Sequence, residues 1–149
     1  MFSSTVTVFN RYKSRLGDMW YPTVISGVNV NIDKAAIVAK YGSESKDNAI
    51  LNIHYNFRDG AKIICEKPYL PPKEWENQTN DLLPKTITFT SGEEFDFFIL
   101  GDYVIDEPIS DNDYLSGFYD YMNRNQDFVF AITAVAEYSA IPHFEIMGA

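Results

Sequence analysis

Cysteine, histidine and long apolar runs are all scarce in this chain of 149 residues, and each scarcity excludes a class of protein. The single cysteine, Cys65, excludes an internal disulfide framework and a metal site built from several thiolates. The two histidines, His54 and His143, do not have the spacing of a helical metal-binding pair. The longest apolar runs, 97–100 and 128–132, are far shorter than the roughly 20 residues of a membrane-spanning helix.

Apolar and aromatic residues, by contrast, are plentiful. Hydrophobic residues make up 46% of the chain and aromatic residues 15%, which is enough to build a core and excludes intrinsic disorder. The length suits one domain, because soluble domains commonly have about 100–150 residues. We therefore predict a single domain over residues 1–149. The amino terminus has no basic segment followed by an apolar stretch, so we expect no secretory signal.

Charge is distributed unevenly along the chain, whose net charge is −9. Residues 1–89 carry a net +2, whereas residues 90–149 carry −11, with Arg124 as their only basic side chain. A surface field of one sign repels nucleic acid phosphates and favours partners with a basic face. Solubility alone would also account for such a surface. We expect no specific nucleic acid partner and no membrane partner.

Alternation of apolar and polar residues predicts that most of the regular secondary structure is β-strand. In the first segment, for example, Val6 and Val8 fall on one face. A bulge is expected at Ser26–Gly27, and Pro22 is expected to end its strand or to confine it to a sheet edge. Nine segments are predicted as strands: 4–10, 19–21, 24–32, 50–57, 62–66, 86–90, 95–100, 128–135 and 144–146.

Two segments are predicted to be helical. Residues 111–123 follow Ser110, which with Asp113 resembles a capping box. A short helix over 72–78 would begin at Pro72 and turn Trp75 inward. In the longer segment, apolar residues recur at helical spacing: Leu115, Phe118, Tyr119 and Met122. The predicted fold class is therefore mainly β, a small antiparallel barrel or sandwich with these two helices.

Carboxylates are the strongest candidates for catalysis, because paired acids can divide general acid and base roles. Five lie close together in the sequence: Asp102, Asp106, Glu107, Asp111 and Asp113. They could serve a carboxylate-based hydrolase, but a solvated acidic loop before a helix explains them better, since helix starts attract acids. A calcium loop beginning at Asp111 is excluded by Ser116 and Met122 at its sixth and twelfth positions.

The remaining polar groups give no catalytic pattern above background. Cys65 lies in an apolar strand, where a buried inert thiol is expected, and His54 is expected to be exposed or at a sheet edge. We therefore predict no enzymatic activity, no catalytic residue, no cofactor and no metal. A small ligand-binding β-barrel is an alternative from another class, and it would need a deep apolar pocket.

Four short sequence words together resemble a known family. In order they are TVTVFNRY at 5–12, WYPTV at 20–24 with Gly27-Val28, GDYV at 101–104 and IPHFEI at 141–146. They resemble the small minor capsid or neck proteins of tailed phages and prophages from Gram-positive hosts, in which these words recur in this order. The resemblance extends from about residue 5 to residue 146, although residues 35–90 contribute no match to it.

This resemblance implies a non-enzymatic structural protein of the virion, near the head-to-tail joint. Its implied partners are other virion proteins of the head–tail region, and on assembly it could form a homo-oligomeric ring. Its implied location is the virion, or the cytoplasm of a bacterial host that carries the prophage. The loop at 44–48 is one expected contact. The other candidate assembly residues are polar and lie in turn-rich segments: Arg11, Lys13, Arg15, Asp106, Glu107, Asp111 and Asp113.

Overall fold

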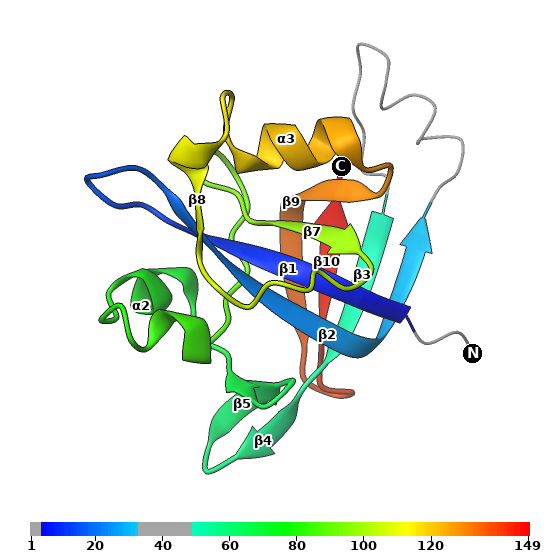
Figure 1. The fold of residues 1–149 in the computed structure, drawn as a ribbon. Coiled ribbons are helices and arrows are strands. Elements are labelled where there is room, and N and C mark those ends of the chain that lie inside the picture. Colours follow the sequence, from blue (N-terminus) through cyan, green and yellow to red (C-terminus); the bar gives the residue numbers. More distant parts are fainter. Residues whose placement is uncertain (1–3, 33–48) are drawn as a thin grey trace.

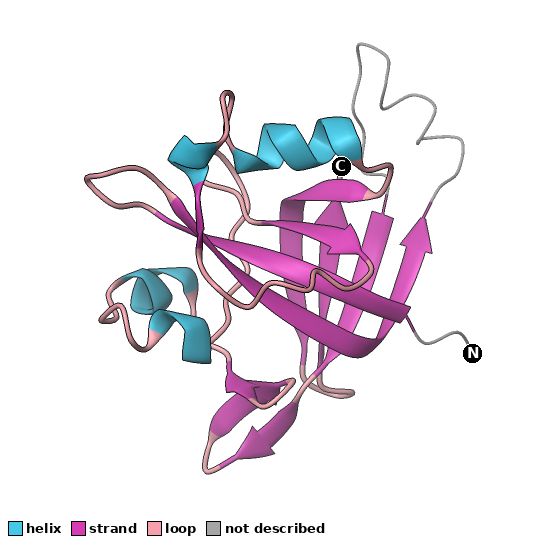
Figure 2. Cartoon of the chain, viewed as in Figure 1, coloured by secondary structure: helices cyan, strands magenta, loops and turns pink. Residues whose placement is uncertain are grey.

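The structure is a computed structural model, and it describes residues 4–32 and 49–149. Of these, 48% lie in strands and 15% in helices, which confirms the mainly β class (Figure 1, Figure 2). The helical segments are α2 (Pro72–Glu76), η1 (Leu83–Lys85), η2 (Asp111–Asp113) and α3 (Phe118–Asn125). The strands are β1 (Ser4–Tyr12), β2 (Met19–Ile32), β3 (Ala49–His54), β4 (Asn56–Arg58), β5 (Ala61–Ile64), β6 (Lys67–Pro68), β7 (Phe97–Leu100), β8 (Ile109–Ser110), β9 (Val129–Tyr138) and β10 (His143–Gly148). The predicted contact loop at 44–48 lies outside the described residues.

Six antiparallel strands close into a barrel in the order β1–β7–β9–β10–β3–β2, and the pairing of β2 with β1 completes the ring (Figure 1). The short strand β8 adds to β2 outside this ring. Strands β4, β5 and β6 form a separate small sheet beside the barrel. Of the two predicted architectures, the structure is therefore the barrel.

The long strand β2 (Met19–Ile32) continues through Pro22 and, in the described part of the chain, has a strand partner on one side only at that residue, which is the edge position that was one of the two expected outcomes. Pro22 lies opposite Phe9 of β1, and β8 pairs with β2 only at Met19 and Trp20. Proline is tolerated because one edge of β2 has no strand partner at this position among the described residues. The predicted bulge at Ser26–Gly27 is confirmed. Ser4 and Val6 of β1 pair with Val28 and Ile25 of β2, so β2 has one extra residue between these two pairs.

The wall formed by β1, β7 and β9 is buried on both faces. Phe98 of β7 faces the interior of the barrel, whereas its neighbours Phe97 and Ile99 pack outside against α3. In β9, Phe130 belongs to the inner core and Val129 to the outer core. Because both faces are covered, these strands need continuous apolar runs and not alternation.

The longer helix begins later than predicted. Residues 111–113 form the 3₁₀ turn η2, and α3 begins only at Phe118. Gly117 immediately before it has φ of 91°, which a continuous α-helix cannot contain. Leu115, expected on the buried face, is therefore fully exposed, and Ser110 makes no side-chain cap.

The short helix is confirmed, with a proline at its start and Trp75 buried. The predicted strand 86–90 is wrong: within the described part of the chain these residues form a single isolated bridge, between Ile87 and Tyr69. The predicted strand 50–57 is divided at Tyr55, where the chain leaves the barrel for the small sheet.

Candidate functional site

The tip of the β1–β2 hairpin and η2 lie next to one another (Figure 1). The Asn112 side-chain amide donates a hydrogen bond to the Leu16 carbonyl oxygen at 2.6 Å, and the Asp111 backbone N–H donates to the Asp18 carbonyl oxygen at 2.9 Å. The fold thus joins the basic segment 11–15 to the acidic segment 111–113, which are almost a hundred residues apart in the sequence.

Arg11 belongs to β1 and not to the exposed loop in which it was expected. Its guanidinium carbon lies 4.6 Å from the ring centroid of Trp20 and 4.7 Å from that of Phe95. A guanidinium placed between two aromatic faces gains cation–π attraction and is held in one orientation. Arg11 also lies 3.8 Å from an Asp18 carboxylate oxygen. Its side chain is therefore mostly occupied within the chain.

Lys13 and Arg15, the other two candidate cations, are exposed at the hairpin. The Lys13 ammonium lies 2.6 Å from the Glu94 carboxylate, and this hydrogen bond raises the pKa of Lys13. Arg15 makes no ion pair with another described residue. Of the three, Arg15 is the most available for contact with another molecule.

Asp111 holds two elements together. One of its carboxylate oxygens accepts hydrogen bonds from the Trp20 indole N–H at 2.9 Å and from the Phe118 backbone N–H at 2.8 Å. The second contact satisfies an N–H in the first turn of α3, which otherwise has no partner within the helix. Asp111 therefore has a structural task, and the Phe118 contact is a cap that Ser110 was expected to provide.

The other candidate carboxylates, Asp102, Asp106, Glu107 and Asp113, are exposed. Asp106 lies on the segment between β7 and β8, close enough to Lys67 to favour its charged form, although burial lowers the pKa of Lys67 overall. In residues 4–32 and 49–149, no group of three or more His, Cys, Asp or Glu side chains has the arrangement of a metal site.

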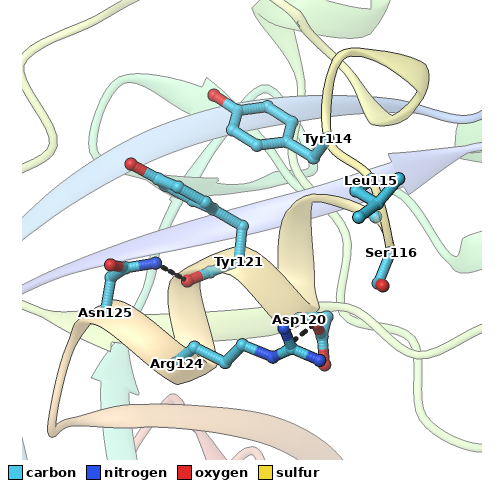
Figure 3. Close-up of a pocket in the computed structure, with 8 residues that line it drawn as sticks. Tyr114, Leu115, Ser116, Asp120, Tyr121, Arg124 and Asn125 are labelled. Carbon is cyan, nitrogen blue, oxygen red and sulfur yellow. Dashed lines mark hydrogen bonds and ion pairs between the residues drawn. The ribbon is translucent and has the colours of Figure 1, made fainter.

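A shallow pocket of about 160 Å³ lies between the segment after η2 and the exposed side of α3 (Figure 3). The ring centroids of Tyr114 and Tyr121 lie 4.7 Å apart at one side of the pocket. Asp120 and Arg124 form an ion pair of 3.0 Å at the other. Leu115 at its rim is fully exposed. We call residues 13–17, residues 111–117 and the exposed side of α3 the loop face.

Asp96 is a functional candidate that the sequence did not reveal. It is buried and accepts hydrogen bonds from the Arg11 backbone N–H at 2.8 Å, the Thr90 backbone N–H at 2.9 Å and the Asn10 side-chain amide at 2.9 Å. Burial nevertheless raises the pKa of Asp96 to about 7. An acid placed directly before an apolar strand was the only signal in the sequence.

Cys65 is exposed, contrary to expectation, and its thiol donates a weak hydrogen bond to the Val24 carbonyl oxygen at 3.2 Å. It lies in a turn with φ of 50°, where the chain leaves β5, so its side chain does not enter the core. His54 is exposed as expected, and it lies opposite His143 in the register of β3 and β10.

No helix among the described residues is both long and apolar enough to cross a membrane. Comparison with curated proteins and with solved structures gives no match. A family described as a family of unknown function (DUF6751) matches residues 1–149, the whole of the chain. The protein therefore belongs to the DUF6751 family.

Proposed function

We propose that this protein is a non-enzymatic structural component of a tailed phage or prophage virion, a minor capsid or neck protein at the head–tail joint. It acts by binding other virion proteins through its loop face. The resemblance of its four sequence words to that class supports the place in the virion. The exposed leucines of the loop face are the structural observation that supports binding.

Leu16 is 89% exposed at the hairpin tip, and Leu115 is fully exposed before α3. The two segments are joined by the hydrogen bond from Asn112 to Leu16. Burial of a leucine side chain stabilises a complex by about 1.5–3 kcal/mol. Two leucines on adjoining loops therefore supply substantial binding energy without any change in the barrel.

Charge complements these apolar contacts. The chain carries a net −9, with −11 in residues 90–149, so free subunits repel one another as they approach. The same field would steer the subunit towards a basic face on a neighbouring protein. A ring of copies would place Arg15 of one subunit near an acidic surface of the next. In the cell the protein would lie in the virion, or in the host cytoplasm before assembly.

The test is co-expression of the protein with the products of the genes on either side of its own, followed by affinity capture at low salt. We expect capture of a portal, capsid or tail protein, and a weaker yield at high salt. The double variant L16S/L115S should weaken capture by about tenfold or more.

Ile141 provides the matched control, because it is 67% exposed in the turn between β9 and β10. The I141S variant should capture the partner as well as the natural chain does. If L16S/L115S captures the partner as well as the natural chain does, the partner does not bind through the leucines of the loop face. A monomer that captures no virion protein and binds a metabolite tightly would favour the ligand-binding barrel.

A further inference from the structure

The pairing of β3 with β10 brings the two histidines of the chain together. His54 is the last residue of β3 and His143 is the first residue of β10, and the two are partners in the antiparallel register of these strands. The centroids of their rings lie 5.9 Å apart. In Figure 1 this end of β3 and β10 is the end of the barrel away from α3, so the pair is separate from the loop face.

The hydrogen-bond pattern of the ladder places these two side chains close together. The Tyr55 backbone N–H donates to the Pro142 carbonyl oxygen at 3.3 Å, so Tyr55 and Pro142 form a hydrogen-bonded pair. The two kinds of pair alternate along an antiparallel ladder, and His54 and His143 therefore form a non-hydrogen-bonded pair. This is the closer kind, in which the Cβ atoms are about 4.5–5.5 Å apart. The two rings thus leave the same face of the sheet side by side.

His143 is held in the orientation of a metal ligand. Its Nδ1 lies 2.6 Å from the Ile141 carbonyl oxygen. A carbonyl oxygen can only accept, so Nδ1 carries the proton, and Nε2 of the neutral ring presents a lone pair. The Tyr138 ring stacks on the His143 ring at a centroid distance of 4.9 Å and an angle of 12°. Metal-binding histidines are commonly oriented in this way, by a hydrogen bond from the second ring nitrogen to a carbonyl or carboxylate oxygen.

The distance between the rings suits one shared ion. Two imidazoles that bind a tetrahedral zinc ion at about 2.0–2.1 Å have ring centroids about 5 Å apart. The separation of 5.9 Å exceeds this value by about 1 Å. Because His54 is exposed, a rotation of its side chain supplies the remaining closure. Imidazole nitrogen suits zinc, copper and nickel ions, whereas magnesium and calcium prefer oxygen ligands.

We propose that His54 and His143 together bind one divalent transition-metal ion of the Zn²⁺ class through their imidazole nitrogens. The net charge of −9 attracts cations to the chain. No group of three His, Cys, Asp or Glu side chains forms a metal site in the described part of the chain, so water or a ligand from outside the chain takes the other positions on the ion. The expectation of no metal was drawn from spacing along the sequence, and strand pairing brings the two histidines together in spite of that spacing.

The test begins with an NMR titration of the full chain. Each of the two histidine rings gives its own signals, and no other histidine contributes. Zinc chloride should shift the signals of both rings together, with one midpoint and saturation at one ion per chain. Magnesium chloride at equal ionic strength should shift neither, because magnesium prefers oxygen ligands.

Single variants test whether both ligands are needed. H54Q should weaken zinc binding by about tenfold or more in isothermal titration calorimetry, because the second ligand of a chelate binds at a high effective concentration. H143Q should weaken it by a similar factor. The matched control is D59N, which removes an exposed carboxylate between β4 and β5 and should leave zinc affinity unchanged. If H143Q does not fold, H54Q still decides the question, because His54 is exposed.

Thermal unfolding gives a second readout. The two histidines are adjacent only when β3 and β10 are paired, so zinc should bind the folded chain more tightly than the unfolded one and raise its melting temperature. We expect this rise in the natural chain and in D59N, and its loss in H54Q. The proposal is overturned if zinc shifts the signals of only one ring, if magnesium gives the same shifts, or if H54Q binds zinc as tightly as the natural chain does.

Discussion

Among single residues, Asp96 has the most unusual environment. It lies directly before β7, and its carboxylate accepts hydrogen bonds from the Asn10 side chain and the Arg11 backbone in β1 and from the Thr90 backbone. These three donors favour the carboxylate, but burial favours the neutral acid more strongly, and the pKa rises to about 7. Asp96 therefore changes charge near neutral pH inside the fold.

This environment predicts a pH dependence of stability. The pKa of Asp96 is about 7 in the folded chain, against an ordinary value of 3.8. The folded state thus holds the proton more tightly, so the contribution of Asp96 is fully present below about pH 4 and is lost as the pH rises to about 7. In denaturant unfolding, the free-energy advantage of the natural chain over D96N should be larger at pH 5 than at pH 8, by on the order of 2 kcal/mol.

Comparison with D96N isolates this residue, because other carboxylates titrate in both proteins. Asparagine has one oxygen for the three N–H donors, so D96N should also be less stable at pH 5 by about 1–3 kcal/mol. A free-energy difference that is the same at both pH values would contradict the raised pKa.

Asp111 gives a second prediction at the residue scale. The variant D111A leaves both the buried indole N–H of Trp20 and the backbone N–H of Phe118 without an acceptor. We expect a loss of about 2–4 kcal/mol in the free energy of unfolding. The control D111N retains a side-chain oxygen that can accept these hydrogen bonds, so it should recover most of the lost free energy of unfolding. If D111N and D111A are equally unstable, the negative charge and not the hydrogen bonds is what matters.

Among the elements, α3 shows how one residue can set a helix boundary. Gly117 has φ of 91°, and an added Cβ there would lie 3.2 Å from both carboxylate oxygens of Asp111. The chain therefore turns at Gly117, exposes Leu115 and starts the helix at Phe118. The rim of the loop-face pocket depends on this turn.

The variant G117A should destabilise the protein through both backbone strain and crowding. Gly92 is a matched control, since its φ is 95° and no atom lies within 4 Å of its added Cβ. Strain alone should cost G92A about 1–2 kcal/mol in thermal or denaturant unfolding. G117A should cost more, because it also displaces Asp111. An equal loss in both variants would show that crowding at Asp111 has no effect.

At the scale of the whole molecule, charge is the dominant feature, with 21 acidic and 12 basic residues on one barrel. Repulsion between like charges opposes the compact state, and salt screens it. The melting temperature should therefore rise as sodium chloride is added at neutral pH. The expected gain is on the order of 1 kcal/mol, about 4 °C for a domain of this size.

The five ion pairs of the described residues would be weakened by the same salt, but surface pairs contribute little each. The variant D106N/E107Q removes two exposed acids, so its melting temperature should rise less with added salt than that of the natural chain. A melting temperature that falls with salt would indicate that the ion pairs outweigh the repulsion.

The amino-acid sequence by itself determined the elements whose signals are local. Period-two alternation predicted β3. A proline followed by an inward-facing tryptophan predicted α2, and a Ser-Gly pair predicted the bulge of β2. These features depend on neighbouring residues and on the intrinsic conformations of proline and glycine, so no knowledge of the fold is needed to predict them.

Only the tertiary structure decided which distant groups meet. The pairing of β1 with β7 brought Asp96 against Asn10 and Arg11, and the pairing of β8 with β2 placed Asp111 beside Trp20. The tertiary structure also turned Arg11 from an expected surface cation into one held between the rings of Trp20 and Phe95. Apart from that of Arg11 with Trp20, these contacts join residues more than eighty positions apart. Their burial, charge state and partners follow from how the strands pair and not from local pattern.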